Sequence, residues 1–439
     1  MESGGVLLED KPVLGDAQIE RFNETLRRAR SSSFYRRRLA GLPLTIESLT
    51  EVRRFPITSK AELREGSPWD FVAAPQEELV EYHESFGTTG EPVSIWATKH
   101  DFSCWTEQIL DCAVDFKPED IVMIRFPYAI SVPAHTVQAA ARTRGACTIP
   151  VSSRTSISPF TRVIRLMDKL KGSVLACNPF EAILLGETAK LMGLDPARDF
   201  PSLRAICVAG EMLVDARKAQ IERLWNVKVY NLYGSTETGN IAATCTEGKM
   251  HVSADHFLLE VLDPVTYEPL DPSQRGLLAV TTTFMEGTPL IRYDTRDIVR
   301  LLPGESCGCG SKHPVLEHFG RYDQRIRLNG EEILLGDLQE AILTAPSIPV
   351  GLFWMVYLNG QGLVIRMETE CERNGLIAAE AYLSEKLKVR CKIEPVPRGT
   401  LYDREKLLAV ESVCKAKYVA DWRVGGWYPR TLHELTGRE

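Results

Sequence analysis

The pattern of hydrophobic and polar positions divides the chain into three stretches. Over the first 80 residues or so the spacing is helical, and the run AQIERFNETLRRARSSSFYRRRLAG, residues 17–41, predicts a helix. The next segment, SLTEVRRFPITSKAELREG, must break at Pro56, because proline lacks the amide proton that a helix interior needs. We expect helices and connectors in this part of the chain.

Short apolar runs alternate with helical stretches between about residues 80 and 300. The strand-like runs include IVMIRFPY, GSVLACN, RAICVAG and VKVYNLYG, and the helical ones include ISPFTRVIRLMDKLKG and EAILLGETAKLMG. Such alternation is typical of layered α/β folds with largely parallel strands. The polar segment HFGRYDQRIRLNG, residues 318–330, interrupts it, and a smaller mixed α/β pattern follows. We therefore place a domain boundary there.

Length and charge narrow the class of protein. At 439 residues the chain is too long for one compact core, which favours a large unit and a smaller one. The 52 Lys and Arg against 59 Asp and Glu give a net charge of −7, and no basic run indicates nucleic acid. Neither a signal peptide nor an apolar run of roughly 18 residues is found. We expect a cytoplasmic protein without membrane contact, whose 11 cysteines are reduced thiols or metal ligands.

One glycine- and hydroxyl-rich segment, SFGTTGEPV, carries candidate phosphate-binding chemistry. Gly87 and Gly90 would let the backbone approach an anion closely. The hydroxyls of Ser85, Thr88 and Thr89 stand beside them and can join main-chain amides around a polyphosphate. The same residues suit an ordinary turn between two strands, and the segment lacks the Gly-Lys-Ser/Thr ending of the Walker pattern.

The segment YNLYGSTETGN, residues 230–240, is more informative. Its strand-like start ends in glycine and runs into hydroxyls and one carboxylate, as at the sheet edge where α/β folds bind ligands. Glu237 could hold Mg²⁺ there. The alternative is a polar loop in which Ser235 or Thr236 caps a following helix.

Two charged residues further along could meet a sugar. Asp297, in YDTRD, offers two acceptor oxygens to a vicinal diol such as a ribose, and Arg321 is a second candidate at the same sugar. Taken singly, each could instead be a surface salt-bridge residue. In this order, the three segments supply what an enzyme needs to join a carboxylate to AMP.

The motifs give the chain a resemblance to the phenylacetate:CoA ligases among the adenylate-forming acyl-CoA synthetases. The resemblance covers nearly the whole chain, and its strongest parts are FPITSKAEL, HESFGTTGEPV, LYGSTETG, PLIRYDTRDIVRLLPG with CGCGSKHP, and GRYDQRIRLNGEEILLGDLQEAIL. It implies that a carboxylate and ATP give acyl-AMP and pyrophosphate, after which a thiol takes the acyl group. It further implies that the protein uses ATP, Mg²⁺ and the co-substrate CoA and that it forms a homodimer.

The resemblance also implies the domain organisation. A large N-terminal adenylation domain with layered sheets and helices would cover residues 1–320, and a small mobile α+β C-terminal domain would cover 331–439. Residues 321–330 form the hinge between them, with Asp323 at the family's hinge position. Rotation is needed because one pocket cannot present both a lysine at the pyrophosphate side and a thiol tunnel to the same carbonyl.

Most nucleotide-binding residues follow from the same resemblance. They are Ser85, Gly87, Thr88, Thr89, Gly90, Glu211, Asn231, Tyr233, Gly234, Ser235, Asp297 and Arg321. Thr236 and Glu237 join them as catalytic residues, Glu237 through Mg²⁺. Two positions depart from the family: Phe86 replaces a small hydroxyl residue in the phosphate loop, and Asn329 stands where arginine is common.

The family's adenylation lysine lies in a C-terminal loop, where its ammonium stabilises charge that develops as the acid attacks the α-phosphate. Here the corresponding string is GTLYDREKLLAVESVCKAKYVADWR, with an insertion between its two matching halves. The half after the insertion favours Lys415, whereas the spacing from Gly399 favours Lys406. Both could be solvated surface lysines. We prefer Lys415.

Four residues form a candidate metal site. Cys245 and His251 flank the loop CTEGKMH, and Cys307 and Cys309 lie in CGCG. Three thiolates and one imidazole complete a tetrahedral set for Zn²⁺, which would make the site structural. Cys-x-Cys also occurs by accident, and His251 could be an ordinary loop histidine. Similar Cys and His positions in relatives of the family favour zinc.

The acid pocket is defined by position in the family alone. Its residues would be Phe126, Tyr128, His135, Ala209 and Gly210. Aromatic and small residues together suit a flat aryl or arylacetic acid better than a long fatty chain, which needs an extended apolar tunnel. Tyr128 or His135 could meet the hydroxyl or amino group of a substituted benzoate, and Phe126 could equally be an ordinary core residue.

The acyl acceptor stays open at this stage. An aryl-acid:CoA ligase is the first interpretation. The alternative is a stand-alone adenylating enzyme of a natural-product pathway, which passes an aryl group such as a hydroxy- or aminobenzoate to a carrier protein, an amine or a hydroxyl. A third interpretation is a nucleotide-binding regulator that has lost its lysine loop.

Overall fold

The computed structural model describes residues 7–8, 11–12, 16–66, 68–85, 91–348, 351–409 and 419–421. Its contacts separate two compact units. The first comprises residues 1–148, 207–210 and 230–323, and the second comprises 149–206, 211–229 and 324–439. Each unit collects segments from several parts of the chain, and the domain limits expected from the sequence stay a prediction. In the described part of the chain no helix is long and apolar enough to cross a membrane.

The first unit begins with a short hairpin and a group of short helices. These elements are β1 (Leu7–Leu8), β2 (Lys11–Pro12), α1 (Asp16–Ala29), α2 (Ser33–Arg38), the 3₁₀ helix η1 (Leu49–Arg54) and α3 (Lys60–Glu65). The helix predicted over residues 17–41 is interrupted, because the Ser32 hydroxyl caps α2 by accepting from the Tyr35 amide at 3.2 Å. The predicted break at Pro56 is confirmed, since η1 ends before it. A capping box of Ser59 and Glu62 starts α3 after it.

The remaining elements of the first unit are strands and two further helices. A hairpin of β3 (Leu79–Glu84) and β4 (Ser94–Thr98) leads into α4 (Lys99–Leu110), β5 (Ile121–Ile124) and α5 (Val132–Thr143). Its later strands are β9 (Lys228–Ser235), β10 (Gly239–Thr244), β11 (Met250–Val252), β12 (Phe257–Leu262), β13 (Gly276–Thr282), β14 (Tyr293–Leu302) and β15 (Val315–Arg321). They follow one another in a large sheet in the order β12-β13-β14-β15-β11-β10-β9.

The pairing of these later strands corrects one expectation. Between β9 and β15 every described pair is antiparallel, so the prediction of largely parallel strands up to about residue 300 is wrong for this part. Every residue of β12 and β13 is buried. A strand that is buried on both faces has the continuous apolar run that parallel strands also show, so the sequence pattern does not distinguish the two.

The second unit holds helices and a smaller sheet. Its earlier elements are α6 (Phe160–Leu170), β7 (Val174–Cys177), α7 (Pro179–Leu191) and α8 (Asp215–Trp225), while β6 (Cys147–Pro150), β8 (Ala205–Ala209) and β9 have residues in both units. Its later elements are β16 (Ile326–Leu328), β17 (Glu331–Ile333), α9 (Leu335–Leu343), β18 (Trp354–Leu358), β19 (Leu363–Glu368), α10 (Arg373–Leu387), β20 (Cys391–Val396), α11 (Lys406–Ala409) and β21 (Val419–Asp421). Of three further 3₁₀ turns, η2 (Gln76–Glu78) and η3 (Gly304–Ser306) belong to the first unit, and η4 (Tyr322–Gln324) has residues in both.

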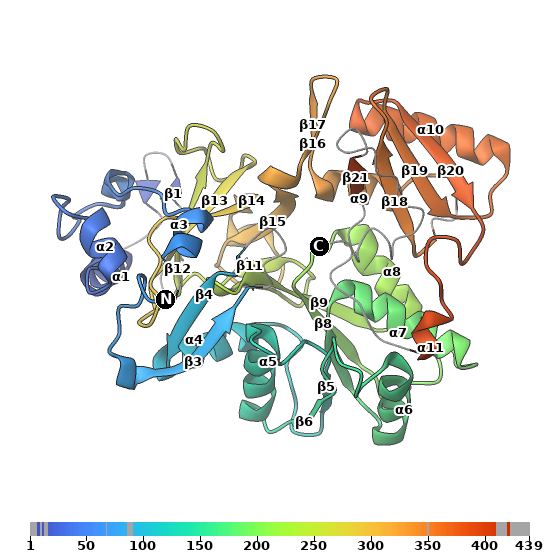
Figure 1. The fold of residues 1–439 in the computed structure, drawn as a ribbon, viewed down its shortest axis with the longest axis horizontal. Coiled ribbons are helices and arrows are strands. Elements are labelled where there is room, and N and C mark those ends of the chain that lie inside the picture. The colour runs from blue at the N-terminus through green and yellow to red at the C-terminus, as the bar shows by residue number, and fades with distance from the viewer. Residues whose placement is uncertain are drawn as a thin grey trace. The chain divides into compact units, whose positions relative to one another are not determined.

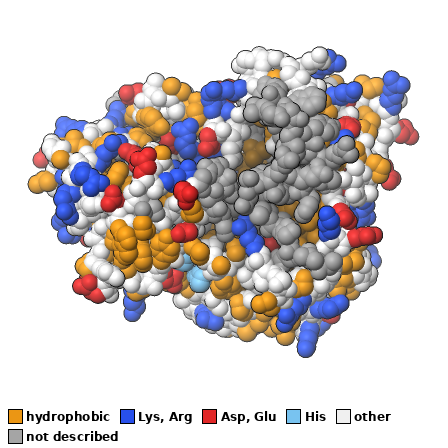
Figure 2. All heavy atoms as spheres, viewed as in Figure 1, with side chains coloured by type: hydrophobic (Ala, Val, Ile, Leu, Met, Phe, Trp, Pro, Cys, Tyr) orange, Lys and Arg blue, Asp and Glu red, His pale blue; other side chains and the backbone are white. Residues whose placement is uncertain are grey.

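Each unit has its own hydrophobic core. In the second unit the sheet runs in the order β20-β19-β18-β21, and Figure 1 shows α10 beside β19 and β20. Side chains of α9 and α10 share one buried cluster with this sheet. In the first unit the N-terminal helices share a cluster with β12, β13 and β14. The α/β class predicted from the sequence is confirmed. On the face shown in Figure 2, basic and acidic side chains are interspersed.

Candidate functional site

Asp297 of β14 lies at the centre of a polar cluster. The Tyr233 hydroxyl of β9 donates to its Oδ2 at 2.7 Å, and His318 Nε2 of β15 lies 3.4 Å from its Oδ1. Arg321 stands opposite Asp297 in the β14–β15 ladder. Burial alone would raise the pKa of the Asp297 carboxyl, but His318, Tyr233 and Arg321 stabilise the anion, and the net pKa is lowered. Asp297 therefore stays ionised and can accept hydrogen bonds from the hydroxyls of a ligand.

Glu237, at the turn between β9 and β10, is the second carboxylate of the site, and it is buried. Lys60 Nζ lies 2.8 Å from its Oε1, and the Tyr293 hydroxyl donates to the same oxygen at 3.2 Å. Burial raises the pKa of Glu237, but the charge and hydrogen bond of Lys60 outweigh it, and the net pKa is lowered. Tyr293 and Asp297 both lie on β14, and Tyr233 and Glu237 lie on β9 and the turn after it, so the same two elements supply both carboxylate clusters.

Lys60, Tyr293 and His318 are site residues that the sequence pattern did not single out. Lys60 lies in FPITSKAEL and is the first residue of α3. A cation at the first turn of a helix interacts unfavourably with the helix dipole. This unfavourable position indicates that Lys60 has a role other than helix stability, and it is the sequence feature that could have identified the residue. Tyr293 and His318 have no comparable signal, because only the pairing of distant strands brings them to the two carboxylates.

The turn after Tyr233 is a hairpin. Ser235 pairs with Gly239 in the antiparallel β9–β10 ladder, and the hydroxyls of Ser235 and Thr238 lie 3.1 Å apart. The alternative that Ser235 or Thr236 caps a helix is therefore wrong. Gly234 is required, because a Cβ there would come within 2.0 Å of the Gly239 carbonyl oxygen. Ser235 is exposed and Thr236 half-buried, so both hydroxyls can reach a ligand.

Two predicted segments lie outside the described residues. They are residues 86–90, with Phe86, Gly87, Thr88, Thr89 and Gly90, and residues 410–418, with Lys415. Ser85 itself is described, and it joins the two ends of the first segment. Its amide donates to the Val93 carbonyl and its hydroxyl accepts from the Val93 amide, both at 2.9 Å. Lys406, the other lysine candidate, is the exposed first residue of α11.

Tyr128 and His135, two predicted pocket residues, lie together. Their rings are 5.3 Å apart in an edge-to-face arrangement, and His135 Nε2 lies 2.9 Å from the Tyr128 carbonyl oxygen. The ring of His83 lies 5.6 Å from that of His135. Burial raises the pKa of Tyr128 to about 12, and its buried hydroxyl has no hydrogen-bond partner in the described part of the chain. Such a hydroxyl is unfavourable unless a ligand satisfies it.

The other predicted pocket residues lie at the ends of two strands, β5 and β8. Phe126 is buried just after β5, as an ordinary core residue would be. Ala209 is buried at the end of β8, and Gly210 follows it with a φ of +83°, which suits glycine. Among these residues, only Gly210 is exposed to solvent.

Glu211 and Asn231, both predicted to bind nucleotide, already have protein partners. Glu211 Oε2 accepts from the Phe180 amide at 3.3 Å, at the start of α7. The Asn231 amide of β9 donates to the Thr244 hydroxyl at 2.8 Å, and its side-chain Nδ2 lies 3.2 Å from Met250 Sδ. In this structure Asn231 therefore faces β10 and β11.

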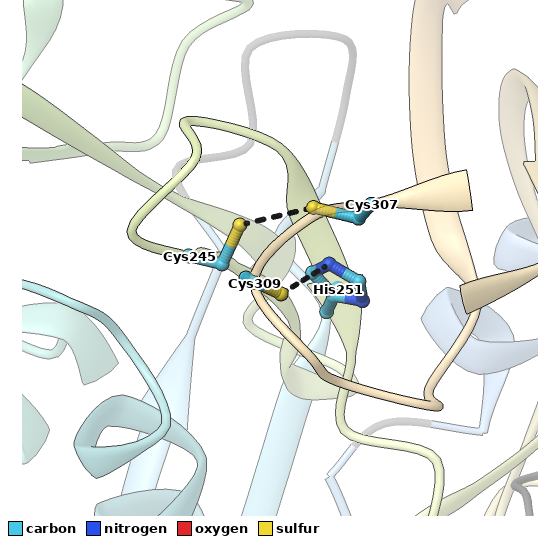
Figure 3. A group of neighbouring side chains, drawn as sticks. All are labelled: Cys245, His251, Cys307 and Cys309. Atoms are coloured by element: carbon cyan, nitrogen blue, oxygen red, sulfur yellow. Dashed lines mark hydrogen bonds between the residues drawn. The ribbon is translucent and has the colours of Figure 1, made fainter. Parts of the chain in front are cut away.

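The four predicted metal ligands converge, as Figure 3 shows. Cys245 Sγ lies 3.7 Å from Cys307 Sγ, and Cys309 Sγ lies 3.3 Å from His251 Nε2. His251 Nδ1 donates to the His313 carbonyl at 2.7 Å, which leaves Nε2 for a metal. Backbone and His251 hydrogen bonds lower the pKa of Cys307 to about 7, while burial raises that of Cys245 to about 11. The set offers four soft or borderline ligands at one point.

In the second unit, two buried carboxylates hold Arg404, which precedes Lys406. Arg404 Nε bonds Glu187 of α7 at 2.8 Å, and its Nη2 bonds Glu368 of β19 at 2.6 Å. Arg398 also bonds Glu187, at 2.8 Å. Burial would raise the pKa of Glu187, but Arg404 and the other cations around it lower the net pKa. The start of the lysine-bearing segment is therefore fixed to α7 and β19.

The predicted hinge residue, Asp323, is the last residue of the first unit. It lies in η4, directly after β15, and its Oδ1 is 3.5 Å from Arg321 Nε. The pair is partly exposed, so it contributes little to stability.

Several known proteins are similar to this chain in sequence or in structure. Residues 85–286 match the family of AMP-binding enzymes. A phenylacetate-coenzyme A ligase of Thermus thermophilus is 30% identical over 72% of each chain, and one of Pseudomonas putida is 27% identical over 82% of this chain and 83% of its own. A solved structure of 2-hydroxyisobutyryl-CoA ligase in the postadenylation state, with the adenylate 2-HIB-AMP, has a TM-score of 0.80. It is 22% identical and covers 92% of this chain and 88% of its own, which shows the fold.

Proposed function

Because the chain belongs to the phenylacetate-CoA ligase family of AMP-forming enzymes, we propose that it activates an aromatic carboxylic acid with ATP and passes the acyl group to the CoA thiol. The observation that carries this proposal is the meeting of Tyr233, Asp297 and Arg321, from three strands, in one charged cluster. An ionised, half-buried carboxylate beside an arginine suits the ribose of a bound nucleotide. The Tyr233 ring supplies an aromatic face next to it.

Glu237 is the residue that would hold magnesium. Its lowered pKa keeps the carboxylate charged, which a hard divalent cation requires of an oxygen ligand. Lys60 now neutralises this carboxylate at 2.8 Å, so it must share Glu237 with the metal or release it. Bound magnesium would neutralise phosphate charge, while Ser235 and Thr236 offer exposed or half-buried hydroxyls to the phosphate oxygens.

The reaction attaches the acid to the α-phosphorus. A carboxylate oxygen attacks that atom, the bond to the bridging oxygen breaks, and pyrophosphate leaves with the electron pair. A lysine ammonium that contacts both the acid and the phosphate stabilises the charge that develops. We assign this role to Lys415, with Lys406 as the second candidate. In support, Arg404 holds the preceding segment in one position through Glu187 and Glu368.

For the acid, the Tyr128 pair with His135 favours an aromatic substrate. Aryl rings pack well against edge-to-face aromatic side chains. The buried hydroxyl of Tyr128 has no hydrogen-bond partner among the described residues, which favours an acid with a ring hydroxyl or amino group. We therefore propose a substituted benzoate or arylacetate as the substrate class.

Zinc is the metal that fits the Cys245, His251, Cys307 and Cys309 set, because three thiolates and an imidazole complete its tetrahedral coordination. With all four positions filled by protein, the ion would support the fold and leave none for substrate. We also propose that Asp323 is the hinge of a mobile C-terminal domain and that the enzyme is a homodimer, as the resemblance implies.

Two assays test the proposal. Purified protein with ATP and magnesium is given a panel of aryl and arylacetic acids, and pyrophosphate release is measured. CoA is then added, and the thioester is sought by mass spectrometry. We expect both products. Pyrophosphate without a thioester would favour transfer to a carrier protein, an amine or a hydroxyl. The absence of pyrophosphate with every acid would contradict the proposal and leave the nucleotide-binding regulator.

A further inference from the structure

A second group of metal-binding side chains lies on α4, outside the site described above. His100, Cys104 and Glu107 follow one another at intervals of four and three residues, so they share one face of the helix. His256, from the connection between β11 and β12, completes the group. His100 Nε2 lies 3.6 Å from Cys104 Sγ, and His256 Nε2 lies 3.7 Å from Glu107 Oε2. Ligand atoms of Cys104, Glu107 and His256 all lie within 4.8 Å of one another.

We infer that Cys104, Glu107 and His256 form a second binding site for a divalent transition metal such as zinc. Metal–ligand bonds of about 2.0–2.3 Å in a tetrahedral arrangement place neighbouring ligand atoms roughly 3.3–3.8 Å apart. The 3.7 Å between His256 and Glu107 is already in that range, so only small side-chain movements close the site. His100 is exposed and one turn from Cys104, so its ring can turn in as a fourth ligand.

The surrounding charges favour a cation. The carboxylates of Glu107, Asp101 and Glu286 act on Cys104, as does the cation Arg28. The charges that act on His256 are the carboxylates of Asp111, Glu107 and Asp255 and the cation Arg21. An excess of negative charge around three metal-binding side chains raises the local concentration of divalent cations.

Binding is coupled to the loss of a proton. Burial and neighbouring carboxylates raise the pKa of Cys104 to about 12, so the free thiol is protonated. The metal must therefore displace the thiol proton to solvent and bind the sulfur as a thiolate. Cys245 has the same character, because burial raises its pKa to about 11. His256 keeps a neutral imidazole, since burial lowers its pKa, and a neutral ring is the form that binds metals.

The ring of His256 is held mainly by packing. It meets the ring of Phe284 edge to face at 5.3 Å, and its buried Nδ1 has no hydrogen-bond partner within the described ranges. Few hydrogen bonds therefore have to break when the ring turns toward a metal. The group shares no residue with the Cys245 cluster, so the two sites can be emptied separately.

Cobalt titration of the full chain tests this inference. The double substitution Cys309→Ser and His251→Gln removes the Cys245 cluster, and this background protein, freed of metal by a chelator, is titrated with Co²⁺. We expect this background protein to bind one equivalent of Co²⁺ and to show a thiolate-to-cobalt absorption band. Adding Cys104→Ser should abolish the band, whereas Cys147→Ser, at an exposed cysteine outside both groups, should leave it unchanged.

Glu107→Gln is a second ligand variant that should fold normally, because the Glu107 side chain is 65% exposed and its replacement should not disturb the core. It removes a ligand, so cobalt binding should weaken by at least the roughly 10–100-fold that changes to outer-shell partners of a metal cause. A background protein that binds no cobalt, or a band that survives Cys104→Ser, would overturn the inference. So would an affinity that Glu107→Gln leaves unchanged.

Discussion

Glu237 and Asp297 stay ionised although Glu237 is buried and Asp297 is half-buried. In each case burial raises the pKa, and neighbouring donors or cations more than compensate. Lys60 is the cation beside Glu237, and it is the first residue of α3. The charges that the proposed chemistry needs thus depend on a few neighbouring side chains, and single substitutions can test them.

Lys60→Gln would leave Glu237 buried without its cation. Loss of one partner of a largely buried ion pair costs roughly 3 kcal/mol, which we expect as a fall in the free energy of unfolding at pH 7, measured by urea denaturation. The folded pKa of Glu237 is lowered, so the pair stabilises the fold above the ordinary pKa of about 4.3 and this contribution is lost as the pH falls through the lowered pKa. The difference between variant and parent should therefore shrink below about pH 4.

Lys117→Gln is the matched control for this measurement. It breaks an ion pair with Asp115 whose side chains are both about half exposed, so its effect should be no more than about 0.5 kcal/mol. Equal losses in the two variants would show that the environment of Glu237 does not strengthen the pair.

Tyr128→Phe tests the substrate class. We expect kcat/KM for acids with a ring hydroxyl or amino group to fall roughly tenfold, the effect of one lost hydrogen bond, while unsubstituted acids react at the parent rate. Folding should be unaffected, because the removed hydroxyl has no partner among the described residues. Tyr382→Phe is the control. It removes a hydroxyl in the second unit that lies 3.1 Å from the Thr344 hydroxyl. A uniform loss with all acids would contradict a specific role.

Lys415→Ala and Lys406→Ala distinguish the two lysine candidates. Removal of one preorganised donor usually slows the chemical step by the order of 10²-fold or more, so we expect this loss in pyrophosphate release for Lys415→Ala. Lys406 is exposed at the start of α11, and its substitution should change the rate little. The reverse result would transfer the role to Lys406, and two unaffected variants would remove both from the mechanism.

At the scale of elements, short connections decide where the reactive groups lie. The β9–β10 hairpin turns at Ser235–Thr238 and presents two hydroxyls above a buried carboxylate. The ladder of β14 and β15 places Arg321 opposite Asp297. In the second unit, α7 and β19 hold the segment before α11 through Arg404. Each element thus fixes the direction of one or two functional side chains.

Glu187→Gln tests the anchor of the lysine-bearing segment. The change leaves Arg404 and Arg398 without their shared carboxylate, so the segment should become less well positioned. We expect pyrophosphate release to slow at least tenfold, an effect of lost orientation. Thioester formation from a prepared acyl adenylate and CoA should be preserved, because it does not use the lysine.

Lys190→Gln is the control for the anchor. It removes another partner of Glu187, at 3.2 Å on the exposed side of α7, and leaves both arginines in place. Both half-reactions should proceed as in the parent. If Glu187→Gln slows the two half-reactions equally, the network serves stability alone.

At the scale of the whole molecule, the Cys245 cluster ties together two distant stretches of the chain within the first unit. Cys245 and His251 flank one loop, and Cys307 and Cys309 belong to another. A structural ion that joins loops in this way contributes directly to the free energy of folding.

Removal of the proposed zinc should therefore lower the stability of the fold and leave the chemical step unchanged. We expect Cys309→Ser to lose the zinc of this site by elemental analysis and to lower Tm by on the order of 5–10 °C. The rate per folded molecule should be unchanged at a temperature well below Tm, because no open coordination position faces a substrate. Cys147→Ser should change neither zinc content nor Tm. A parent protein without zinc would contradict the assignment.

The class of the fold and part of the candidate site could be predicted from the sequence. Apolar periodicity and turn residues predicted the α/β class, the break at Pro56 and the strand that ends at LYGSTETG. The motifs named Asp297, Tyr233 and Arg321, which the structure brings together. Periodicity and motifs are local properties of a chain, so the residues that they identify are those whose role depends on near neighbours or on a recurring chemical pattern.

Only the tertiary structure decided which partners those residues meet. Lys60 reaches Glu237, and Tyr293 donates to the same oxygen, although all three come from different elements far apart in the chain. The antiparallel pairing of β9 to β15 was likewise not predicted, because buried strands such as β12 and β13 have the same apolar sequence pattern in parallel and antiparallel sheets. Long-range ion pairs and strand pairing follow from how whole elements pack, and packing depends on all the elements at once rather than on any one segment.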